Sequence, residues 1–329
     1  MSGYILICPY FGSLPNNFQL WLNSCKYNSE IDFLIITDDM TSYEVPHNVK
    51  IIHMPLGKLQ NLIKVKFPFV KHDIKPYKLC DYKPAYGYLF SDYIADYDYW
   101  GNCDVDLIYG NLSKFLPTES YDKISNLGHT TFYRNVKEIN TAFMKPSQVS
   151  LTYREILSSD ANFGFDEIGD YGIKNIFKKH NYTVYPLEKY VADVSPNSSN
   201  LVLTHYDFKK DLFYQDSSES IISFENGHIF SWTMSRGVVH KKEYAYVHFQ
   251  KRMMGDYRTR KNNEYFLIGP HGFYDYQTVN KTLFTLFHGK NIDSELIRRK
   301  FKALKNKIRR EIAIRRLIKK NRTSSRIQR

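Results

Sequence analysis

Two short apolar runs with an amphipathic segment between them constrain the fold more than any other feature of this sequence. Residues 4–8 (YILIC) and 32–39 (DFLIITDD) have the length and composition of buried strands, and residues 18–28 (FQLWLNSCKYN) have the apolar spacing of a helix. A strand, a crossover helix and a second strand begin a parallel sheet with a right-handed connection. A third strand is expected at 49–55. The sequence therefore predicts an α/β fold.

The remaining chain up to residue 290 is predicted to complete one domain of mixed structure. Helical spacing begins at Lys83, with Pro84 in a first-turn position, and a second helix is expected at 165–180. Glu225 to Gly227 sit where a hairpin turn is expected. Extended segments are expected at 97–103, 129–135, 201–208, 220–232 and 243–250.

The net charge of +12 is confined to the C-terminal tail, which we treat as a separate segment, residues 291–329. This tail holds 15 Lys or Arg and 3 Asp or Glu, whereas the other 290 residues hold 31 of each sign. A basic helix is expected at 294–320, followed by a disordered end. Apolar residues recur along the helix every three or four positions, at Ile297, Phe301, Leu304, Ile308 and Ile312.

The basic helix has two interpretations. A helix with an apolar stripe and many Lys and Arg residues suits the headgroup layer of an anionic membrane, where each basic residue contributes about 1 kcal/mol. The alternative is a solvated helix packed on the domain. No apolar run approaches a membrane span and no signal peptide is recognisable, so a cytoplasmic protein, peripheral on the inner face of the cell membrane, is expected.

The four cysteines do not indicate a metal site or a disulfide framework. They are scattered through the first third of the chain, without a C-x-x-C pair or a His spacing that would build a zinc site. Reduced thiols are therefore expected at Cys8, Cys25, Cys80 and Cys103.

Two aspartates separated by one residue are the main candidates for chemistry. Asp104 and Asp106 flank Val105, so in an extended chain both carboxylates point to the same side, about 6 to 7 Å apart. At the carboxyl edge of a sheet, such a pair can bind a divalent cation that also binds diphosphate oxygens. A solvated turn is the alternative interpretation.

A family resemblance extends over residues 3–255 and rests on several quoted blocks. These are ICPYFGSLPNNFQLWLNSC, DFLIITDD, CDYKPAYGYLFSDY, DYWGNCDVDLIYGNL and YVHFQKR. They resemble bacterial glycosyltransferases of the GT-A fold that act in polysaccharide biosynthesis, including those of capsule and O-antigen gene clusters. The resemblance implies a Rossmann-like mixed sheet flanked by helices, and transfer of a sugar from a nucleotide sugar, most often UDP-linked, with Mn²⁺ or Mg²⁺ at the D-x-D.

The resemblance also implies roles for individual residues. Asp106 would bind the metal, Asp104 would contact the donor ribose or share the metal, and His248 would be a third ligand. Phosphate contacts are expected from Lys83, and from Lys251 and Arg252, which follow His248 in the sequence. The nucleoside would meet Tyr10, Asp38 and Asp39.

Catalysis and sugar binding are assigned to two further pairs. Asp166 and Glu167 resemble the acidic pair that opens a helix in inverting members of the fold, although acids are also preferred there as helix caps. His129 and Arg134 would line a sugar pocket. The acceptor would be a glycan or a lipid-linked oligosaccharide, and the transferred sugar a hexose such as galactose. Gly101 to Cys103 replace the usual aliphatic run before the aspartates, which leaves sugar identity and stereochemistry open.

The sequence fits two other function classes less well. A nucleic-acid-binding protein could use the basic tail, but the rest of the chain has no charge surplus and no recognition motif, so no nucleic acid partner is expected. A nucleotidyltransferase would keep the metal and nucleotide. Such enzymes usually carry a glycine-rich phosphate loop after the first strand, and residues 9–17 (PYFGSLPNN) are a poor match.

Overall fold

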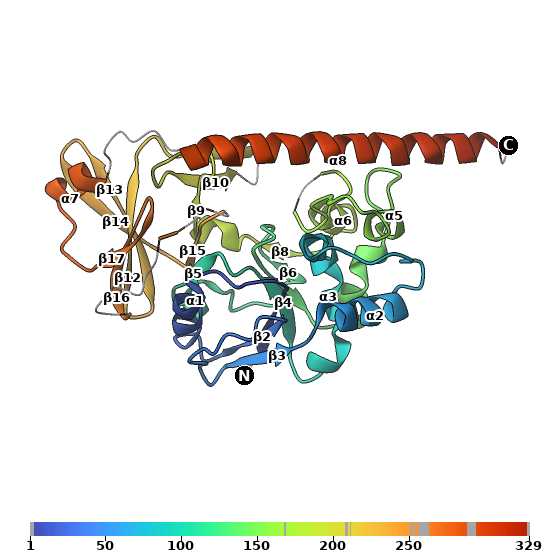
Figure 1. The fold of residues 1–329 in the computed structure, drawn as a ribbon, viewed down its shortest axis with the longest axis horizontal. Coiled ribbons are helices and arrows are strands. Elements are labelled where there is room, and N and C mark those ends of the chain that lie inside the picture. Colours follow the sequence, from blue (N-terminus) through green and yellow to red (C-terminus); the bar gives the residue numbers. More distant parts are fainter. Residues whose placement is uncertain are drawn as a thin grey trace.

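The fold is seen in a computed structural model as three β-sheets with helices around them and one long helix across the top (Figure 1). The structure describes residues 3–167, 169–207, 210, 212–250, 252, 254–255, 263–287 and 294–327, with the side chains of the last helix described for 300–319.

The first sheet has seven strands in the order β3-β2-β1-β4-β7-β6-β8. The predicted strands and crossover helix at the N-terminus are confirmed, as β1 (Tyr4–Tyr10), α1 (Phe18–Cys25), β2 (Ile31–Thr37) and β3 (Val49–His53). These strands and β4 (Tyr99–Cys103) run parallel to one another. The strand β7 (Thr130–Arg134) runs antiparallel to β4. The edge is completed by β6 (Lys123–Ile124) and β8 (Val184–Tyr185).

Both faces of this sheet are buried, which explains why its strands are almost continuously apolar. Alternate residues of β1 enter different cores: Ile5 and Ile7 lie in one cluster and Leu6 and Cys8 in the other. The first cluster includes residues of α2 (Leu56–Lys66), and the second includes residues of α1. The central strands are therefore held between two layers, with their carboxyl ends at one edge.

Gly101 explains the break in the aliphatic run before the aspartates. A Cβ atom at this position would lie 2.2 Å from the carbonyl oxygen of Thr131 on β7 and 2.8 Å from a methyl carbon of Leu6 on β1. Only glycine allows this close approach of three neighbouring strands. The glycine therefore serves the packing of the sheet.

The other two sheets pack on one another. One has the order β11-β10-β9-β15-β5, from β5 (Leu107–Tyr109), β9 (Val191–Val194), β10 (Leu203–Asp207), β11 (Leu212–Gln215) and β15 (Tyr246–His248). The other has the order β14-β13-β12-β16-β17, from β12 (Ser220–Glu225), β13 (His228–Ser235), β14 (Val238–Tyr244), β16 (Tyr265–Gly269) and β17 (Gly272–Asp275). A shared core contains Val194 and Val247 from the first sheet and Phe224 and Phe266 from the second.

The hairpin predicted at residues 225–227 is confirmed. Strands β12 and β13 pair antiparallel up to Glu225 and His228. The two residues between them, Asn226 and Gly227, have positive φ values of 47° and 86°. Such values are typical of the two-residue turn that Asn-Gly favours.

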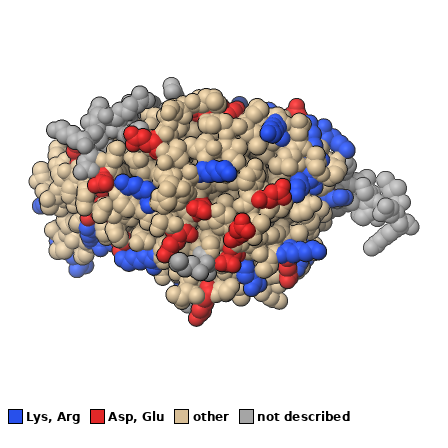
Figure 2. All heavy atoms as spheres, turned by 90° about the horizontal axis from the view of Figure 1, so that it is seen from below, with Lys and Arg blue, Asp and Glu red and all other residues tan. Residues whose placement is uncertain are grey.

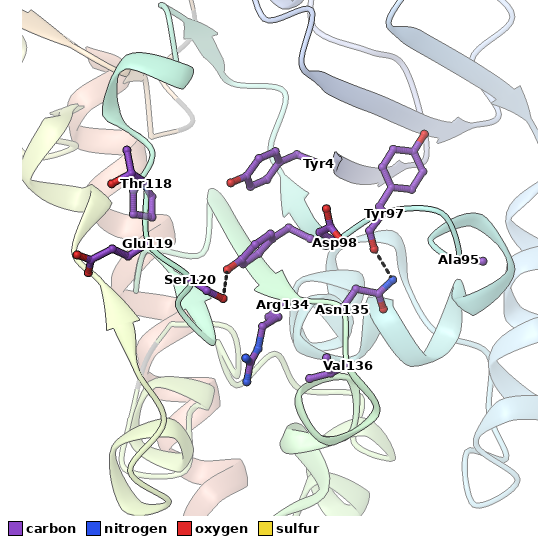
Figure 3. Close-up of a pocket in the computed structure, with 12 residues that line it drawn as sticks. Tyr4, Ala95, Tyr97, Asp98, Thr118, Glu119, Ser120, Arg134, Asn135 and Val136 are labelled. Atoms are coloured by element: carbon purple, nitrogen blue, oxygen red, sulfur yellow. Dashed lines mark hydrogen bonds between the residues drawn. The ribbon is translucent and has the colours of Figure 1, made fainter. Parts of the chain in front are cut away.

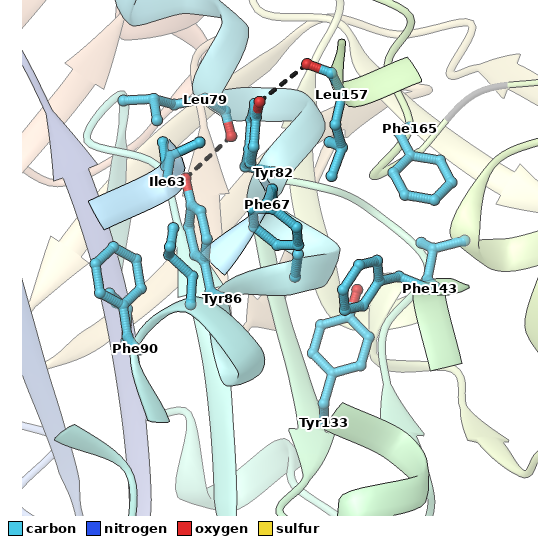
Figure 4. Packing of buried hydrophobic residues seen from close by; sticks show 14 of the residues in the cluster. Ile63, Phe67, Leu79, Tyr82, Tyr86, Phe90, Tyr133, Phe143, Leu157 and Phe165 are labelled. Carbon is cyan, nitrogen blue, oxygen red and sulfur yellow. Dashed lines mark hydrogen bonds between the residues drawn. The ribbon is translucent and has the colours of Figure 1, made fainter. Parts of the chain in front are cut away.

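The helix predicted from Lys83 begins earlier and is not a regular α-helix. The 3₁₀ helix η1 (Pro76–Ala85) is followed by α3 (Tyr86–Leu89) and η2 (Ser91–Tyr93). Tyr82 of η1 and Tyr86 of α3 lie in the core: the Tyr82 hydroxyl donates to the carbonyl of Leu157 at 2.9 Å, and the Tyr86 hydroxyl to that of Leu79 at 3.1 Å (Figure 4). Much of the DYKPAYG block is therefore structural.

The single helix predicted over 165–180 is wrong, because only α6 (Ile173–Lys179) is helical there. Asp166 and Glu167 lie in a turn before it. Gly164 and Gly169 on either side of this pair have positive φ values of 66° and 80°, which a continuous helix does not allow. The acids are consequently not helix caps.

The short elements between these segments complete the layers. They are η3 (Ser113–Phe115), α4 (Lys137–Asn140), η4 (Ala142–Met144), α5 (Tyr153–Leu157), η5 (Leu187–Tyr190) and α7 (Lys281–Phe287).

The basic C-terminal helix α8 (Ser294–Ile327) confirms the helix predicted at 294–320. It continues beyond it, so the prediction of disorder is wrong for 321–327, a stretch without the Gly or Pro that would end a helix. Ala313, Ile314 and Leu317 pack against the core of the first sheet. The predicted apolar stripe faces away from this contact: Phe301 is 70% exposed and Ile308 49%.

Charge is distributed differently on the rest of the molecule. Figure 2 shows the face that lies opposite α8 in Figure 1, where basic and acidic side chains are interspersed without a large patch of one sign.

Among the described residues, no helix combines the length and the apolar character needed to span a bilayer.

Candidate metal centre at the carboxyl end of the first sheet

The two aspartates of the D-x-D leave the carboxyl end of β4, and backbone pairing brings two histidines to them. The amide of Asp104 donates to the carbonyl of His129, just before β7, at 2.9 Å. The amide of Phe249, just after β15, donates to the carbonyl of Asp106 at 2.9 Å. His248 pairs with Leu107 of β5. Three segments far apart in the sequence therefore meet at this edge.

Asp104, Asp106 and His248 form a possible cation site, as the sequence predicts. One ligand atom of each of the three residues lies within 4.8 Å of the others. Nε2 of His248 is 3.5 Å from Oδ1 of Asp106. Two carboxylates and one imidazole suit a divalent cation, so the residues present fit the metal that the resemblance implies.

Asp193 on β9 is a member of this cluster that the sequence analysis missed. Its Oδ1 is 2.8 Å from Nδ1 of His248, and its Oδ2 accepts a hydrogen bond from Nε2 of Gln250 at 2.7 Å. Burial lowers the pKa of His248, but the carboxylates of Asp106 and Asp193 outweigh burial and raise it to about 10. A charged residue inside the buried strand VADV was the available signal.

Lys83 is buried and paired with Asp104 and Asp166. Its Nζ is 2.8 Å from Oδ1 of Asp104 and 3.3 Å from Oδ2 of Asp166, and it donates to the carbonyl of Gly128 at 2.9 Å. Burial opposes its charge, but the two carboxylates keep its pKa well above the ordinary value. All three ammonium protons have acceptors, so Lys83 orients Asp104 and is not free for the predicted phosphate contact.

The acidic pair has two different environments. Asp166 is buried against Lys83, and this approach needs Gly128, where a Cβ would lie 2.4 Å from Oδ2 of Asp166. Burial raises the pKa of Asp166. Glu167 is partly buried. Burial and the charges of Asp166 and Asp193 raise its pKa to about 7. Glu167 is therefore the member of the pair that can accept a proton near neutral pH.

The predicted nucleoside contacts lie at the same edge of the sheet. Tyr10 ends β1, and Asp38 and Asp39 follow β2, which runs parallel to it. Oδ1 of Asp38 accepts from the amide of Gly12 at 2.7 Å, and Oδ2 of Asp39 from the amide of Leu14 at 2.7 Å. Hydrogen bonds from the side chain and amide of Thr41 and from the amide of Leu14 lower the pKa of Asp39. Both acids therefore also fasten the loop after β1.

His129 and Arg134 do not share a pocket. His129 is in the cluster, with its ring stacked 3.9 Å from that of His248. Arg134 lies at the other end of β7, opposite Tyr99 at the start of β4, and its guanidinium is 2.6 Å from Asp122. It lines a separate cavity of about 590 Å³ beside Tyr4 (Figure 3). The two residues lie at opposite ends of an extended strand, and the antiparallel direction of β7 brings the end with His129 to the edge that holds the D-x-D.

Arg252 is buried in a structural role. Its guanidinium donates to the carbonyls of Ser198 at 2.7 Å and Ser199 at 2.6 Å, and to that of Pro270 at 3.1 Å. These backbone acceptors occupy the donors that the sequence analysis assigned to the leaving diphosphate. Lys251 lies outside the described residues.

Comparison with known proteins identifies a family without a known activity. A family model described as "Family of unknown function (DUF6625)" matches residues 6–277. No curated protein matches the chain. The matched range includes the D-x-D, the acidic pair Asp166 and Glu167, and His248.

Proposed function

We propose that this chain, which belongs to the family described as "Family of unknown function (DUF6625)", is a metal-dependent glycosyltransferase of the GT-A fold. The observation that carries the proposal is the convergence of Asp104, Asp106 and His248, from separate segments, at the carboxyl edge of a mixed α/β sheet. Ligands of such sheets bind beyond this edge. The donor is a UDP-sugar, with a hexose such as galactose, and the acceptor is a glycan or lipid-linked oligosaccharide of surface polysaccharide biosynthesis.

Each cluster residue has a role in this reaction. Asp106 and His248 hold the cation, Mn²⁺ or Mg²⁺, and Asp104 completes the set while Lys83 fixes its orientation. When bound, the cation supplies positive charge to the donor diphosphate. Asp193 keeps the His248 ring in place through Nδ1, as carboxylates commonly do for histidine ligands.

Glu167 is the general base in the proposed reaction. The acceptor hydroxyl oxygen forms the new bond to the anomeric carbon, the bond from that carbon to the diphosphate oxygen breaks, and the hydroxyl proton passes to Glu167. With a pKa of about 7, this carboxylate is both ionised often enough and basic enough to accept the proton at neutral pH. Asp166, ion-paired with Lys83, supports the turn that presents Glu167.

The nucleoside is placed by the loop after β1. Asp38 and Asp39 fasten this loop at the carboxyl edge, next to Tyr10 and within the same edge as the D-x-D. A half-buried aromatic ring at this position can stack on a base.

The proposal is tested by incubating the protein with a panel of UDP-sugars and Mn²⁺ and measuring UDP release. At least one donor is expected to give metal-dependent release, and Asp106→Asn is expected to abolish it because the cation loses a charged ligand. Asp73→Asn, which removes an exposed ion pair with Lys64, is the matched control and should keep the rate. Absence of UDP release with every donor, or full activity of Asp106→Asn, would contradict the proposal.

The helix α8 is proposed to hold the enzyme at the cytoplasmic face of an anionic membrane. Residues 300–319 include nine Lys or Arg and a single acidic residue, Glu311. At 100° per residue, the exposed apolar positions Phe301 and Ile308 lie opposite the packed positions Ile314 and Leu317. A helix arranged in this way can bind the domain with one face and a headgroup layer with the other.

A further inference from the structure

A cavity, named the Tyr4 cavity, lies at the edge of the first sheet opposite the candidate metal centre. Its volume is about 590 Å³, and it is lined by the first residues of β1 and β4, the last residue of β7, the segment 117–120 and adjoining loop residues (Figure 3). Asp104 follows the other end of β4, about 17 Å from Tyr99 by the rise of a strand. The proposed sugar transfer therefore does not use this cavity, although its volume is typical of ligand sites.

The walls of the Tyr4 cavity are fixed by contacts within the fold. The rings of Tyr4 and Tyr99 are stacked, with centroids 5.1 Å apart and 17° between their planes. The hydroxyl of Tyr99 donates to the carbonyl of Tyr121 at 2.9 Å, which ties the segment 117–120 to β4. On the other side, Nδ2 of Asn135 donates to the carbonyl of Tyr97 at 2.8 Å (Figure 3). The cavity is therefore formed before any ligand arrives, as most ligand sites are.

Several polar groups in the cavity are left for a ligand. The hydroxyls of Tyr4 and Thr118 and the carboxylate of Glu119 have no hydrogen-bond partner among the described residues. Asp98 accepts from the amide of Gly3 at 3.2 Å with Oδ2 alone, so within the described chain its Oδ1 is also left. The ring of Tyr4, partly exposed, lies beside these groups. A ligand that satisfies them carries several hydroxyl groups together with some apolar surface.

The charge of the cavity disfavours an anionic ligand. Asp98 and Glu119 line it, and neither is in an ion pair with another described residue. The guanidinium of Arg134 is 2.6 Å from Asp122, which offsets its positive charge. No lysine or histidine is among the described residues that line the cavity. Phosphates, nucleotides and acidic sugars would therefore meet a negative potential there.

We propose that the Tyr4 cavity binds an uncharged sugar unit of a glycan chain, as a second glycan site separate from the metal centre. The hydroxyl groups of a pyranose can donate to carboxylates and form hydrogen bonds with the hydroxyls of Tyr4 and Thr118. Its C–H groups form apolar surface that packs on an aromatic ring. The proposal rests on the proposed function only for the origin of the glycan, which would be an acceptor chain that the enzyme extends at its other edge.

The test is saturation-transfer NMR of short oligosaccharides with the full-length protein, in EDTA and without nucleotide. The probes are neutral oligosaccharides of hexose, N-acetylhexosamine and deoxyhexose units, with oligogalacturonic acid as the charged comparison. At least one neutral probe is expected to bind. Oligogalacturonic acid is expected to bind more weakly by a factor of about 10 or more, because it places like charges next to Asp98 and Glu119.

A conservative double substitution locates the binding. Tyr4→Phe with Asp98→Asn keeps the stacked ring and the size of both side chains, but removes one hydroxyl and one charge that face the cavity. Affinity for the neutral probe is expected to fall by a factor of about 10 or more, since hydrogen bonds to a charged group are the stronger ones. Tyr93→Phe with Asp96→Asn, at exposed residues outside the cavity, is the matched control and should leave affinity unchanged.

The proposal is overturned if no neutral probe binds, if oligogalacturonic acid binds as tightly as the neutral probes, or if the double variant at Tyr4 and Asp98 keeps full affinity. The same Tm for this variant and for its control shows that a loss of affinity is not a loss of fold. Saccharide binding in EDTA without UDP release in the donor assay contradicts the proposed function alone. UDP release by a protein that binds no neutral probe contradicts the second glycan site alone.

Discussion

Glu167 and Lys83 are two ionisable residues whose surroundings have opposite effects. Lys83 is buried, but Asp104 and Asp166 keep it charged. Burial and neighbouring negative charge instead favour the neutral form of Glu167, with a pKa of about 7. Catalytic acids and bases are often carboxylates whose pKa is shifted far from the ordinary value, and Glu167 has such a pKa beside a candidate metal site.

The activity is expected to depend on pH through the ionisation of Glu167. Because Glu167 must be ionised to accept a proton, the rate of sugar transfer is expected to rise as the pH increases through about 7. Glu167→Gln should lower this rate by a factor of about 100 or more and remove the rise. The measurement is UDP release against pH under saturating donor; a variant with the unaltered pH profile would exclude Glu167 as the base.

The stability of the protein is also expected to depend on the ionisation of Glu167. The folded-state pKa lies above the ordinary value of 4.5, so ionisation of Glu167 costs more in the folded than in the unfolded protein. Its contribution to stability is present below pH 4.5 and is lost as the pH rises to about 7. Glu167→Gln is therefore expected to raise Tm at pH 8 and to leave it nearly unchanged at pH 4. An equal change in Tm at both values would show that ionisation is not the cause.

At the scale of elements, the turn that carries the acidic pair is held by η1. Asp81 accepts hydrogen bonds from the amides of Phe163 at 2.9 Å and Phe165 at 3.0 Å. Lys78, one turn earlier, is 2.7 Å from Asp81 and donates to the carbonyl of Ala161 at 2.6 Å. This buried ion pair fastens the segment directly before Asp166 and Glu167.

Asp81→Asn is therefore expected to destabilise the protein strongly. It leaves the ammonium group of Lys78 buried without its charged partner, which typically costs about 3–5 kcal/mol. Chemical denaturation followed by circular dichroism measures the change in the free energy of unfolding. Asp73→Asn, in an exposed ion pair, is the control and should change it by less than about 1 kcal/mol. Equal effects of the two substitutions would show that the buried pair has no special structural role.

At the scale of the whole molecule, α8 is the source of the charge asymmetry. The opposite face shows interspersed charges (Figure 2), and the chain before residue 291 has no net charge. Phe301 and Leu304 are 70% and 55% exposed on α8, beside many basic residues. The helix therefore combines exposed apolar area with positive charge on one side of the molecule.

Binding to lipid vesicles tests the consequence for the whole protein. The protein is expected to float with vesicles that contain anionic lipid, but not with vesicles of neutral lipid, and to dissociate as salt is added. The triple substitution Phe301→Ser, Leu304→Ser and Ile308→Ser should greatly reduce flotation without lowering Tm, because these side chains are exposed.

The control for this experiment changes two similarly exposed apolar residues elsewhere. Leu212 and Phe213 on β11 are 55% and 50% exposed. Leu212→Ser with Phe213→Ser should leave flotation unchanged. Flotation that is insensitive to lipid charge, or unaffected by the triple substitution on α8, would refute membrane docking by this helix.

Local patterns were enough to predict the first three strands, the crossover helix, the Asn-Gly hairpin and α8. They failed at residues 165–180, where the amide groups of the preceding segment bind Asp81, a residue more than eighty positions away. A helix competes there with a tertiary contact, and sequence spacing does not contain that contact. The same limitation applies to the direction of β7: because it runs antiparallel to β4, His129 lies at the D-x-D edge of the sheet and Arg134 at the opposite edge.

The sequence by itself determined the α/β start of the fold, the placement of the D-x-D after a buried strand, and the separation of charge between domain and tail. These features depend on residues close together in the chain. The tertiary structure decided which side chains meet near the aspartates. It brought Asp193 into contact with His248, paired Lys83 with Asp104, and stacked the rings of His129 and His248. Those contacts depend on the register of strands from distant segments, and register is set by packing of the whole molecule.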